Sequence, residues 1–150
     1  MIVAHPGGTR NSGVLVRDVI QRHSKSANQR RQIARLNNLA TVIADALDRG
    51  DLNELTNAVN MVAQAQQRLH PGVVPAQLRS QLSRLTATGP TVAKLAGGGG
   101  LGTCCLFLTA PPQKATLESR LRSLGWQVLA ATFVDHGAEV IVGDGSSVIG

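Results

Sequence analysis

Two consecutive helices joined by a tight turn constrain the fold of this chain more than any other sequence feature. From residue 30 onward, apolar residues fall at the spacing of one helix face, and this pattern predicts a helix that ends at Gly50. Gly50 suits the left-handed residue that follows a helix, and Asp51 with Glu54 predicts a capping box for the next helix. The apolar residues of the first face are Ile33, Leu36, Ala40, Ile43, Ala44 and Leu47. The sequence therefore predicts a helical hairpin.

Shorter signals on both sides of this hairpin predict the remaining elements. Ser12 is placed to cap a helix over 13–23, and residues 24–28 read as a polar linker. The other expected elements are strands over 1–4, 103–108, 126–134 and 138–142, and helices over 52–69, from about 75 to 88 and after Pro111. This order predicts one α+β domain over residues 1–150, with a four-stranded, mostly antiparallel sheet, helices on one side and a flexible tail over 143–150.

The composition excludes several classes of protein. With 150 residues and 43% hydrophobic residues, the chain can bury a core and is not a disordered tail. The longest stretch without a charge, residues 95–113, is broken by glycines and prolines and does not suit a membrane span. The only cysteines, Cys104 and Cys105, are neighbours, which disfavours a disulfide and indicates two buried strand thiols. Since no signal-peptide pattern follows Met1, we expect a cytoplasmic protein without a membrane partner.

Positive charge is concentrated in the first 35 residues. This segment holds seven Lys and Arg against one acid, whereas the rest of the chain holds eight of each. A basic segment of this kind can meet a polyphosphate, an RNA backbone, an acidic protein surface or only water. The chain has no Tyr, two Phe and one Trp, so the aromatic platform on which single-stranded nucleic acids stack is nearly missing. We therefore expect no nucleic-acid partner.

A run of glycines between residues 97 and 102 has the clearest chemical meaning. Successive glycines allow positive φ and close approach, so their N–H groups can curl into an anion-binding nest. The run lacks the Gly-Lys-Ser/Thr of a P-loop, and it precedes a predicted strand, whereas a dinucleotide fingerprint follows one. Two interpretations stay open, a tight helix-to-strand turn or a phosphate-binding nest. Lys94 likewise could neutralise a phosphate or lie solvated at a helix end.

The segment from Lys94 to Cys104, KLAGGGGLGTC, resembles the third conserved motif of the GHMP kinases, Lys-Leu-Thr/Ser-Gly-Ala followed by glycines. This family includes galactokinase, homoserine kinase and mevalonate kinase. Residues 8–14, GTRNSGV, resemble the Gly-x-x-Arg-x-Ser segment of its sugar kinases, and residues 35–55 and 111–141 are similar to its long helix and closing β-α-β-β unit. The resemblance covers nearly the whole chain but only the family's C-terminal, ferredoxin-like domain, with heptose-7-phosphate kinases as the most similar branch.

This resemblance implies part of a kinase that uses ATP and Mg²⁺ on a sugar or sugar phosphate. The family's N-terminal domain carries a Pro-x-x-x-Gly-Leu-x-Ser-Ser loop and, in many members, a catalytic Asp, and none of the six prolines here begins that pattern. We therefore expect no catalytic residue in this chain and no kinase activity from it alone. The binding residues that the resemblance implies are Gly97, Gly98, Gly99 and Gly100 for the nucleotide, and Arg10 and Ser12 for the substrate.

Two departures from the family motif favour a different function. Ala96 replaces a hydroxyl residue, and Leu101 interrupts the glycines with a side chain that resists left-handed conformations, at a cost of about 1 kcal/mol or more if forced. A loop changed in this way can keep its turn and lose its ligand. The alternative is a non-catalytic interaction module that forms a homodimer or binds another protein. For a kinase half, the expected partner is a separate N-terminal half. The four His residues share no ligand spacing, so we expect no metal site.

Overall fold

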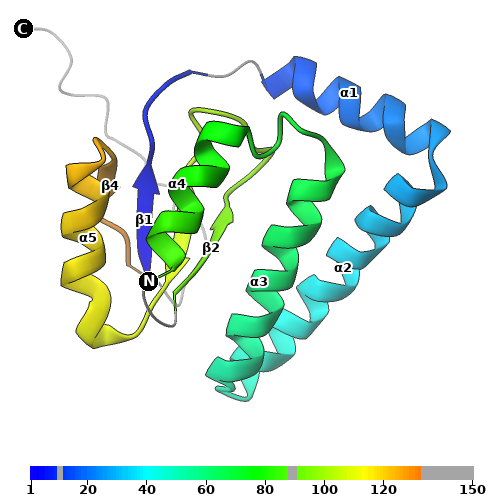
Figure 1. Cartoon of the computed structure of the whole chain (residues 1–150). Helices are drawn as coiled ribbons and strands as arrows, with labels where there is room; N and C mark the ends of the chain where they lie inside the picture. The colour runs from blue at the N-terminus through cyan, green and yellow to red at the C-terminus, as the bar shows by residue number, and fades with distance from the viewer. Residues whose placement is uncertain (10–11, 88–90, 133–150) are drawn as a thin grey trace, which may run out of the picture.

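The computed structural model describes residues 1–9, 12–87 and 91–132 and has an α+β fold (Figure 1). The predicted fold class is therefore confirmed. The strands are β1 (Ile2–His5), β2 (Val92–Leu95), β3 (Cys105–Leu108) and β4 (Gln127–Leu129). The helices are α1 (Ser12–Lys25), α2 (Ala27–Asp48), α3 (Leu52–Leu69), α4 (Ala76–Thr86) and α5 (Lys114–Ser123), and a short 3-10 turn, η1 (Pro111–Gln113), precedes α5.

The sheet has four described strands in the order β2-β3-β1-β4, and every neighbouring pair is antiparallel. β2 is not among the predicted strands, because its four residues include Lys94 and lie in a short gap between Pro90 and the glycines. The predicted strand over 138–142 lies outside the described residues, as does the predicted tail over 143–150. The sheet type is confirmed, but one of its strands is not a predicted one.

One face of the sheet carries the main hydrophobic core. The register places Ile2 opposite Phe107, and Cys105 opposite both Ala4 and Leu95, so these five side chains share a face. Each of them is at most 3% exposed. The helices α4 and α5 lie over this face (Figure 1), and their buried leucines belong to the same core cluster. Because burial of one large apolar side chain contributes about 1.5–3 kcal/mol, this layer supplies a large share of the stability.

The helices α2 and α3 form the predicted hairpin, which lies beside the edge strand β2 (Figure 1). Leu55 and Val59 of α3 form a small cluster against which Val92 of β2 and Leu108 of β3 pack. This second cluster anchors the hairpin to the sheet edge. No helix within the described part of the chain is long and apolar enough to cross a membrane.

The turn between α2 and α3 has the predicted chemistry. Gly50 has a φ of +67°, the left-handed conformation expected after a helix. The Asp51 carboxylate accepts hydrogen bonds from the N–H groups of Asn53 (3.1 Å) and Glu54 (2.9 Å), which confirms the predicted cap. The Glu54 carboxylate pairs with Arg49 on the other side of the turn. The capping box is therefore formed in one direction, from Asp51.

The helices α1 and α2 are separated by a single residue, so the predicted polar linker over 24–28 is wrong. Ser26 is the cap of α2. The Arg30 guanidinium donates to the carbonyls of His23 (3.4 Å) and Ser24 (3.3 Å) in the last turn of α1. Polar residues here cap the start of α2 and bond to the last carbonyls of α1. Polar side chains are favoured in both roles, as they are in linkers, which is why the sequence pattern was misleading.

Candidate functional site

The glycine run forms the turn between β2 and β3. The Ala96 N–H donates to the Cys104 carbonyl (2.9 Å), and the Thr103 hydroxyl donates to the Ala96 carbonyl (2.7 Å). These two bonds close the base of the loop. The predicted helix-to-strand turn is therefore wrong in its first element, because β2 precedes the glycines and the loop joins two antiparallel strands.

Several residues of this loop have backbone conformations that favour glycine. The φ angle is +75° at Gly97, +81° at Gly99, +90° at Gly100 and +76° at Gly102. Among the described residues only glycines have positive φ, so Leu101 is not forced into the left-handed region. The left-handed backbone strain expected at Leu101 is therefore absent. Its side chain is 41% exposed to solvent.

The second half of the loop packs against the segment that links α3 to α4. The Gly100 N–H donates to the Val73 carbonyl (2.8 Å). A Cβ on Gly99 would lie 2.5 Å from the same carbonyl oxygen, and a Cβ on Gly102 would lie 2.6 Å from the carbonyl oxygen of Gly8, just after β1. Close packing alone therefore requires glycine at these positions. No sequence signal indicated Val73 as the partner.

The first half of the loop is open to solvent. Gly97 and Gly98 are exposed, and their N–H groups donate to no acceptor within residues 1–9, 12–87 and 91–132. Both glycines line an apolar cavity of about 230 Å³ that Leu15, Val16 and Ile20 of α1 also line. The N–H groups of Gly97 and Gly98 are exposed to solvent and have no described acceptor, so they can bind an anionic group. The N–H of Gly100 cannot do so, because it already donates to Val73.

The two predicted substrate residues are only partly placed by the structure. Arg10 lies outside the described residues, and so does the side chain of Ser12, which begins α1. The chain just before them approaches the glycine loop, since a Cβ on Gly8 would lie 3.8 Å from both the Gly102 nitrogen and the Leu101 Cβ. The segment that leads to Arg10 therefore runs beside the loop.

Lys94 lies in β2, so its predicted place at a helix end is wrong. Its ammonium donates to the Leu95 carbonyl (2.9 Å), and Gln66 of α3 donates to the same oxygen (3.3 Å). The side chain is half-buried. Burial lowers the pKa of Lys94, and the nearby Cys105 raises it by a smaller amount. Lys94 is thus held against the backbone of its own strand. The contact from Gln66 has no sequence signal.

Of the two thiols predicted to be buried in a strand, only Cys105 is, because β3 begins at Cys105 and Cys104 precedes it. Both thiols are free, with Cys104 half-buried and Cys105 buried in β3. Burial is the main reason why the pKa of Cys105 rises to about 12; Cys104 adds to the rise and Lys94 opposes it. Cys105 therefore stays a neutral thiol within the core at physiological pH and is a poor nucleophile.

The described residues do not provide a metal site. In the described part of the chain, no group of three His, Cys, Asp or Glu side chains could hold a metal ion. Mg²⁺ binds through carboxylates together with substrate phosphates. The Mg²⁺ that the family resemblance implies therefore does not fit these residues, and its ligands would have to come from elsewhere.

The fold is similar to solved structures that include two kinases. A protein from Listeria innocua matches 86% of this chain with a TM-score of 0.78 and 19% identity. A Streptococcus pneumoniae phosphomevalonate kinase, solved with phosphomevalonate and AMPPNP, matches 86% with a TM-score of 0.74 and 19% identity. Mevalonate kinase from L. major, solved with R-mevalonate, matches 81% with a TM-score of 0.70 and 20% identity. No protein-family model and no curated protein matches the sequence.

The likeness covers a limited part of these larger proteins. The chain spans 38% of the Listeria innocua protein and 37% of each of the two kinases. At this level of identity the likeness concerns the fold. The fold found is the one that the glycine motif led us to expect, and this chain has the α+β fold of one part of the GHMP kinases.

Proposed function

We propose that this chain is the C-terminal half, or a separate subunit, of an ATP-dependent small-molecule kinase and is inactive alone. The observation that carries the proposal is the glycine loop, which lies in a kinase-like fold and leaves Gly97 and Gly98 open for a ligand. Phosphoryl transfer depends on positioning the phosphates and neutralising their charge. A chain that supplies one wall of such a site is not expected to turn over substrate without the other wall.

The residues of this chain suit a limited set of tasks in this reaction. The N–H groups of Gly97 and Gly98 would bind phosphate oxygens of the nucleotide. Arg10 and Ser12, which follow the segment beside the loop, would bind the phosphoryl acceptor. Mg²⁺ neutralises phosphate charge in such enzymes, and its ligands would come from the other half, since the described part of this chain offers no metal site. The division explains why both halves would be needed.

We infer that the acceptor is an alcohol group of a sugar or sugar phosphate. The Gly-Thr-Arg-Asn-Ser segment over 8–12 favours this class, with heptose-7-phosphate kinases as the most similar branch. The two similar kinases were solved with phosphomevalonate and R-mevalonate. An acceptor panel for a reconstituted enzyme must therefore contain both compounds beside the sugar phosphates.

Calorimetric titration with Mg-ATP and Mg-ADP tests the nucleotide role, and the variant pair Gly98→Gln and Gly98→Glu makes it specific. Gly98 has no positive φ, and a Cβ there would approach only Val16, at 3.8 Å, so both variants are expected to fold. We expect micromolar binding by the unchanged chain, a change within about threefold for Gln, and weakening by about tenfold or more for Glu, whose charge repels phosphate.

Two outcomes would contradict the nucleotide role. If the unchanged chain shows no nucleotide binding, Gly97–Gly100 do not form a nucleotide site of their own. If both variants weaken binding equally, the nucleotide binds elsewhere and the substitution acts through the fold. A thermal melt of each variant separates these cases from simple unfolding.

A non-catalytic interaction module is the second candidate function, and exposed apolar side chains favour it. Val14 and Ile20 on α1 are 53% and 62% exposed, and Leu101 in the loop is 41% exposed. Of these three, Ile20 lines the same cavity as Gly97. Exposed apolar patches mark protein contacts, and for the interaction module the occupant here would be a second copy of the chain.

Light scattering on the calorimetry sample distinguishes the two functions. A dimeric mass together with absent nucleotide binding would support the interaction module and contradict the kinase half. A monomeric mass with nucleotide binding would support the kinase half. In that case the exposed apolar surface is the expected contact with the missing half.

A further inference from the structure

A second cavity, distinct from the glycine loop, lies where three helix ends meet. The last turns of α1, the first turn of α2 and the last turn of α3 line an open, solvent-accessible cavity of about 620 Å³. This volume is within the range of about 300–1,000 Å³ that small-molecule sites occupy. Its lining is mainly polar and charged, in contrast to the apolar cavity beside Gly97 and Gly98.

Three cationic side chains converge on this cavity. Arg22 and Lys25 come from α1, and Arg68 comes from the last turn of α3. Within the described residues, none of the three has a hydrogen-bond or ion-pair partner, whereas Arg30 nearby is bonded to the end of α1. Asp18 is the one acid in the lining. The cavity therefore has an excess of positive charge that the described chain does not neutralise.

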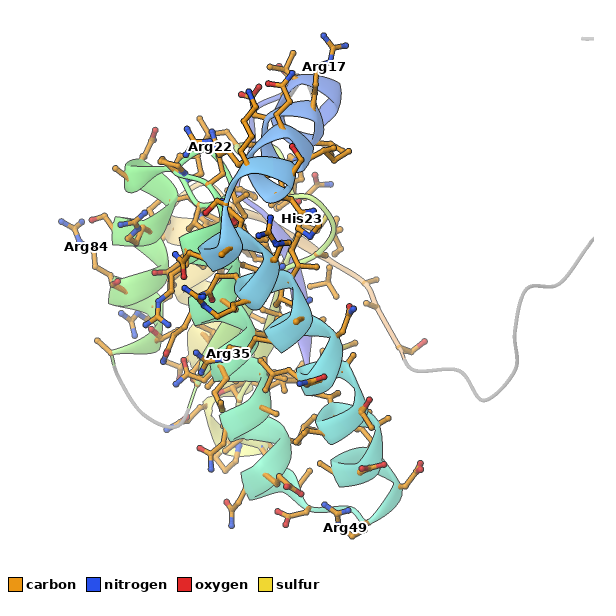
Figure 2. The ribbon with its side chains drawn as sticks, turned by 90° about the vertical axis from the view of Figure 1, so that its right-hand side faces the viewer. Arg17, Arg22, His23, Arg35, Arg49 and Arg84 are labelled. Carbon is orange, nitrogen blue, oxygen red and sulfur yellow. The ribbon has the colours of Figure 1, made fainter. Side chains whose placement is uncertain are left out.

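The position of these cations at helix C-termini explains why they are tolerated there. It does not explain why three of them line one cavity. Lys and Arg are favoured near helix C-termini by the helix dipole, and α1 and α3 both end at this cavity. That effect would be equally satisfied by side chains that point into solvent in different directions. Figure 2 shows Arg22 extending from α1 toward the side on which α4 lies. Arg17, nearer the start of the helix, points away from the rest of the molecule. Both are on α1, yet only Arg22 lines the cavity.

Hydrogen bonds fix the walls between these cations. The Gly72 N–H donates to Nδ1 of His70 (2.9 Å), so the neutral ring carries its hydrogen on Nε2, which lies 4.0 Å from the Asp18 carboxylate. Gln29, which is 8% exposed, donates from Nε2 to the Leu69 carbonyl and so joins the first turn of α2 to the end of α3. Its Oε1 is buried and accepts from no described group. The wall thus combines fixed polar groups with unpaired cations.

We propose that this cavity binds a small phosphorylated molecule, with the phosphate group among Arg22, Lys25 and Arg68. Phosphate carries close to two negative charges, which matches three cations offset by Asp18. Arg and Lys form strong charge-assisted hydrogen bonds with phosphate oxygens. The cavity has room beyond the phosphate, and Ser26 and Asn28 in its lining suit the hydroxyl groups of a polyol. The site does not depend on the nucleotide role of the glycine loop.

Titration of the full chain with ribose 5-phosphate tests the proposal. NMR spectra of the ¹⁵N-labelled chain locate the site, and calorimetry measures the affinity, with ribose and inorganic phosphate as reference ligands. We expect millimolar or tighter binding of ribose 5-phosphate, signal shifts at Gln29 and Gly72, and weaker binding of both reference ligands. Replacing Arg22 and Arg68 together by Gln is expected to weaken ribose 5-phosphate binding by about tenfold or more.

A charge-matched variant distinguishes a built site from general attraction to a basic protein. Replacing Arg17 and Arg84 by Gln removes the same charge from positions that are as exposed as Arg22 and Arg68 but lie outside the cavity lining (Figure 2), and we expect a change within about twofold. Equal weakening by both double variants, or no shift at Gln29 and Gly72, would overturn the site. Binding of inorganic phosphate as tight as that of ribose 5-phosphate would overturn the small-molecule assignment and leave a free-ion site.

Discussion

The sheet with α4 and α5 differs from α1 in how each treats its apolar side chains. Phe107 of β3 and Leu78 of α4 are 0% exposed, whereas Val14 and Ile20 of α1 are 53% and 62% exposed. A side chain in the first region stabilises the fold through burial and packing. The outward side chains of α1 are mostly exposed and add little stability. The difference shows that the stability of the molecule resides in the sheet layer, while α1 presents surface.

Both candidate sites lie along α1. Leu15 and Val16 near its start line the apolar cavity beside the glycine loop, and Arg22 and Lys25 near its end line the cationic cavity. The sheet layer thus provides a rigid frame, and one helix at its margin takes part in each site. This arrangement predicts that substitutions in the two regions have separable effects on stability and on binding.

The largest effect is expected from Phe107→Ala. The ring is fully buried and makes an edge-to-face contact with Trp126, with ring centroids 5.9 Å apart. Removing it leaves a cavity in the sheet layer, so the free energy of unfolding should fall by about 3–5 kcal/mol. Urea unfolding followed by the fluorescence of Trp126, the only tryptophan, measures the change. A loss below about 1 kcal/mol would show that the layer is not the stable frame.

Gly99→Ala should have the next largest effect. Gly99 has a φ of +81°, and a Cβ at this position would lie 2.5 Å from the Val73 oxygen, so an alanine adds backbone strain and a clash. We expect a loss of about 2 kcal/mol or more in the free energy of unfolding. Gly125→Ala is the matched control, because Gly125 has a φ of +79° and open space around it, and should lose about 1 kcal/mol. Equal losses would mean that the contact with Val73 is not tight in solution.

Asp51→Ala probes the hairpin that connects α1 to the sheet layer. The carboxylate caps α3 through two backbone N–H groups, so its removal should cost about 1 kcal/mol in the free energy of unfolding. Asp48→Ala removes the same charge from the last residue of α2, where an acid is unfavourable, and is expected to cost nothing. Equal losses in chemical denaturation would assign the effect to charge and not to the cap.

The capped hairpin and the glycine loop show how much of the fold was predictable from sequence. The turn at Gly50 and Asp51 was predictable because its signals are local: a left-handed glycine and a side chain that bonds to nearby N–H groups. The β2 strand was not, because four residues carry too short an alternation and their place in the sheet is determined by pairing with β3.

The candidate sites divide in the same way. The glycines indicated a turn with an unusual backbone, but their partner Val73 is distant in sequence and carries no signal. The basic segment indicated an anionic partner, but Arg68, which completes the cationic cavity, lies outside that segment and joins it only through the packing of α3 beside α2. Local chemistry was therefore predictable, whereas the convergence of side chains from separate helices was not.

The smallest effect on stability is expected from Ile20→Gln. Comparing it with Val19→Gln separates the outward face of α1 from the face that packs on the core. Ile20 is 62% exposed, so the variant should change the free energy of unfolding by less than about 0.5 kcal/mol. Its neighbour Val19 packs against the main core and should cost about 1 kcal/mol or more when made polar. If α1 presents a docking surface, Ile20→Gln should still reduce self-association in sedimentation experiments. A loss of stability equal to that of Val19→Gln would show that the outward face of α1 is buried in the folded protein in solution. In that case α1 would belong to the stable frame and would not present surface.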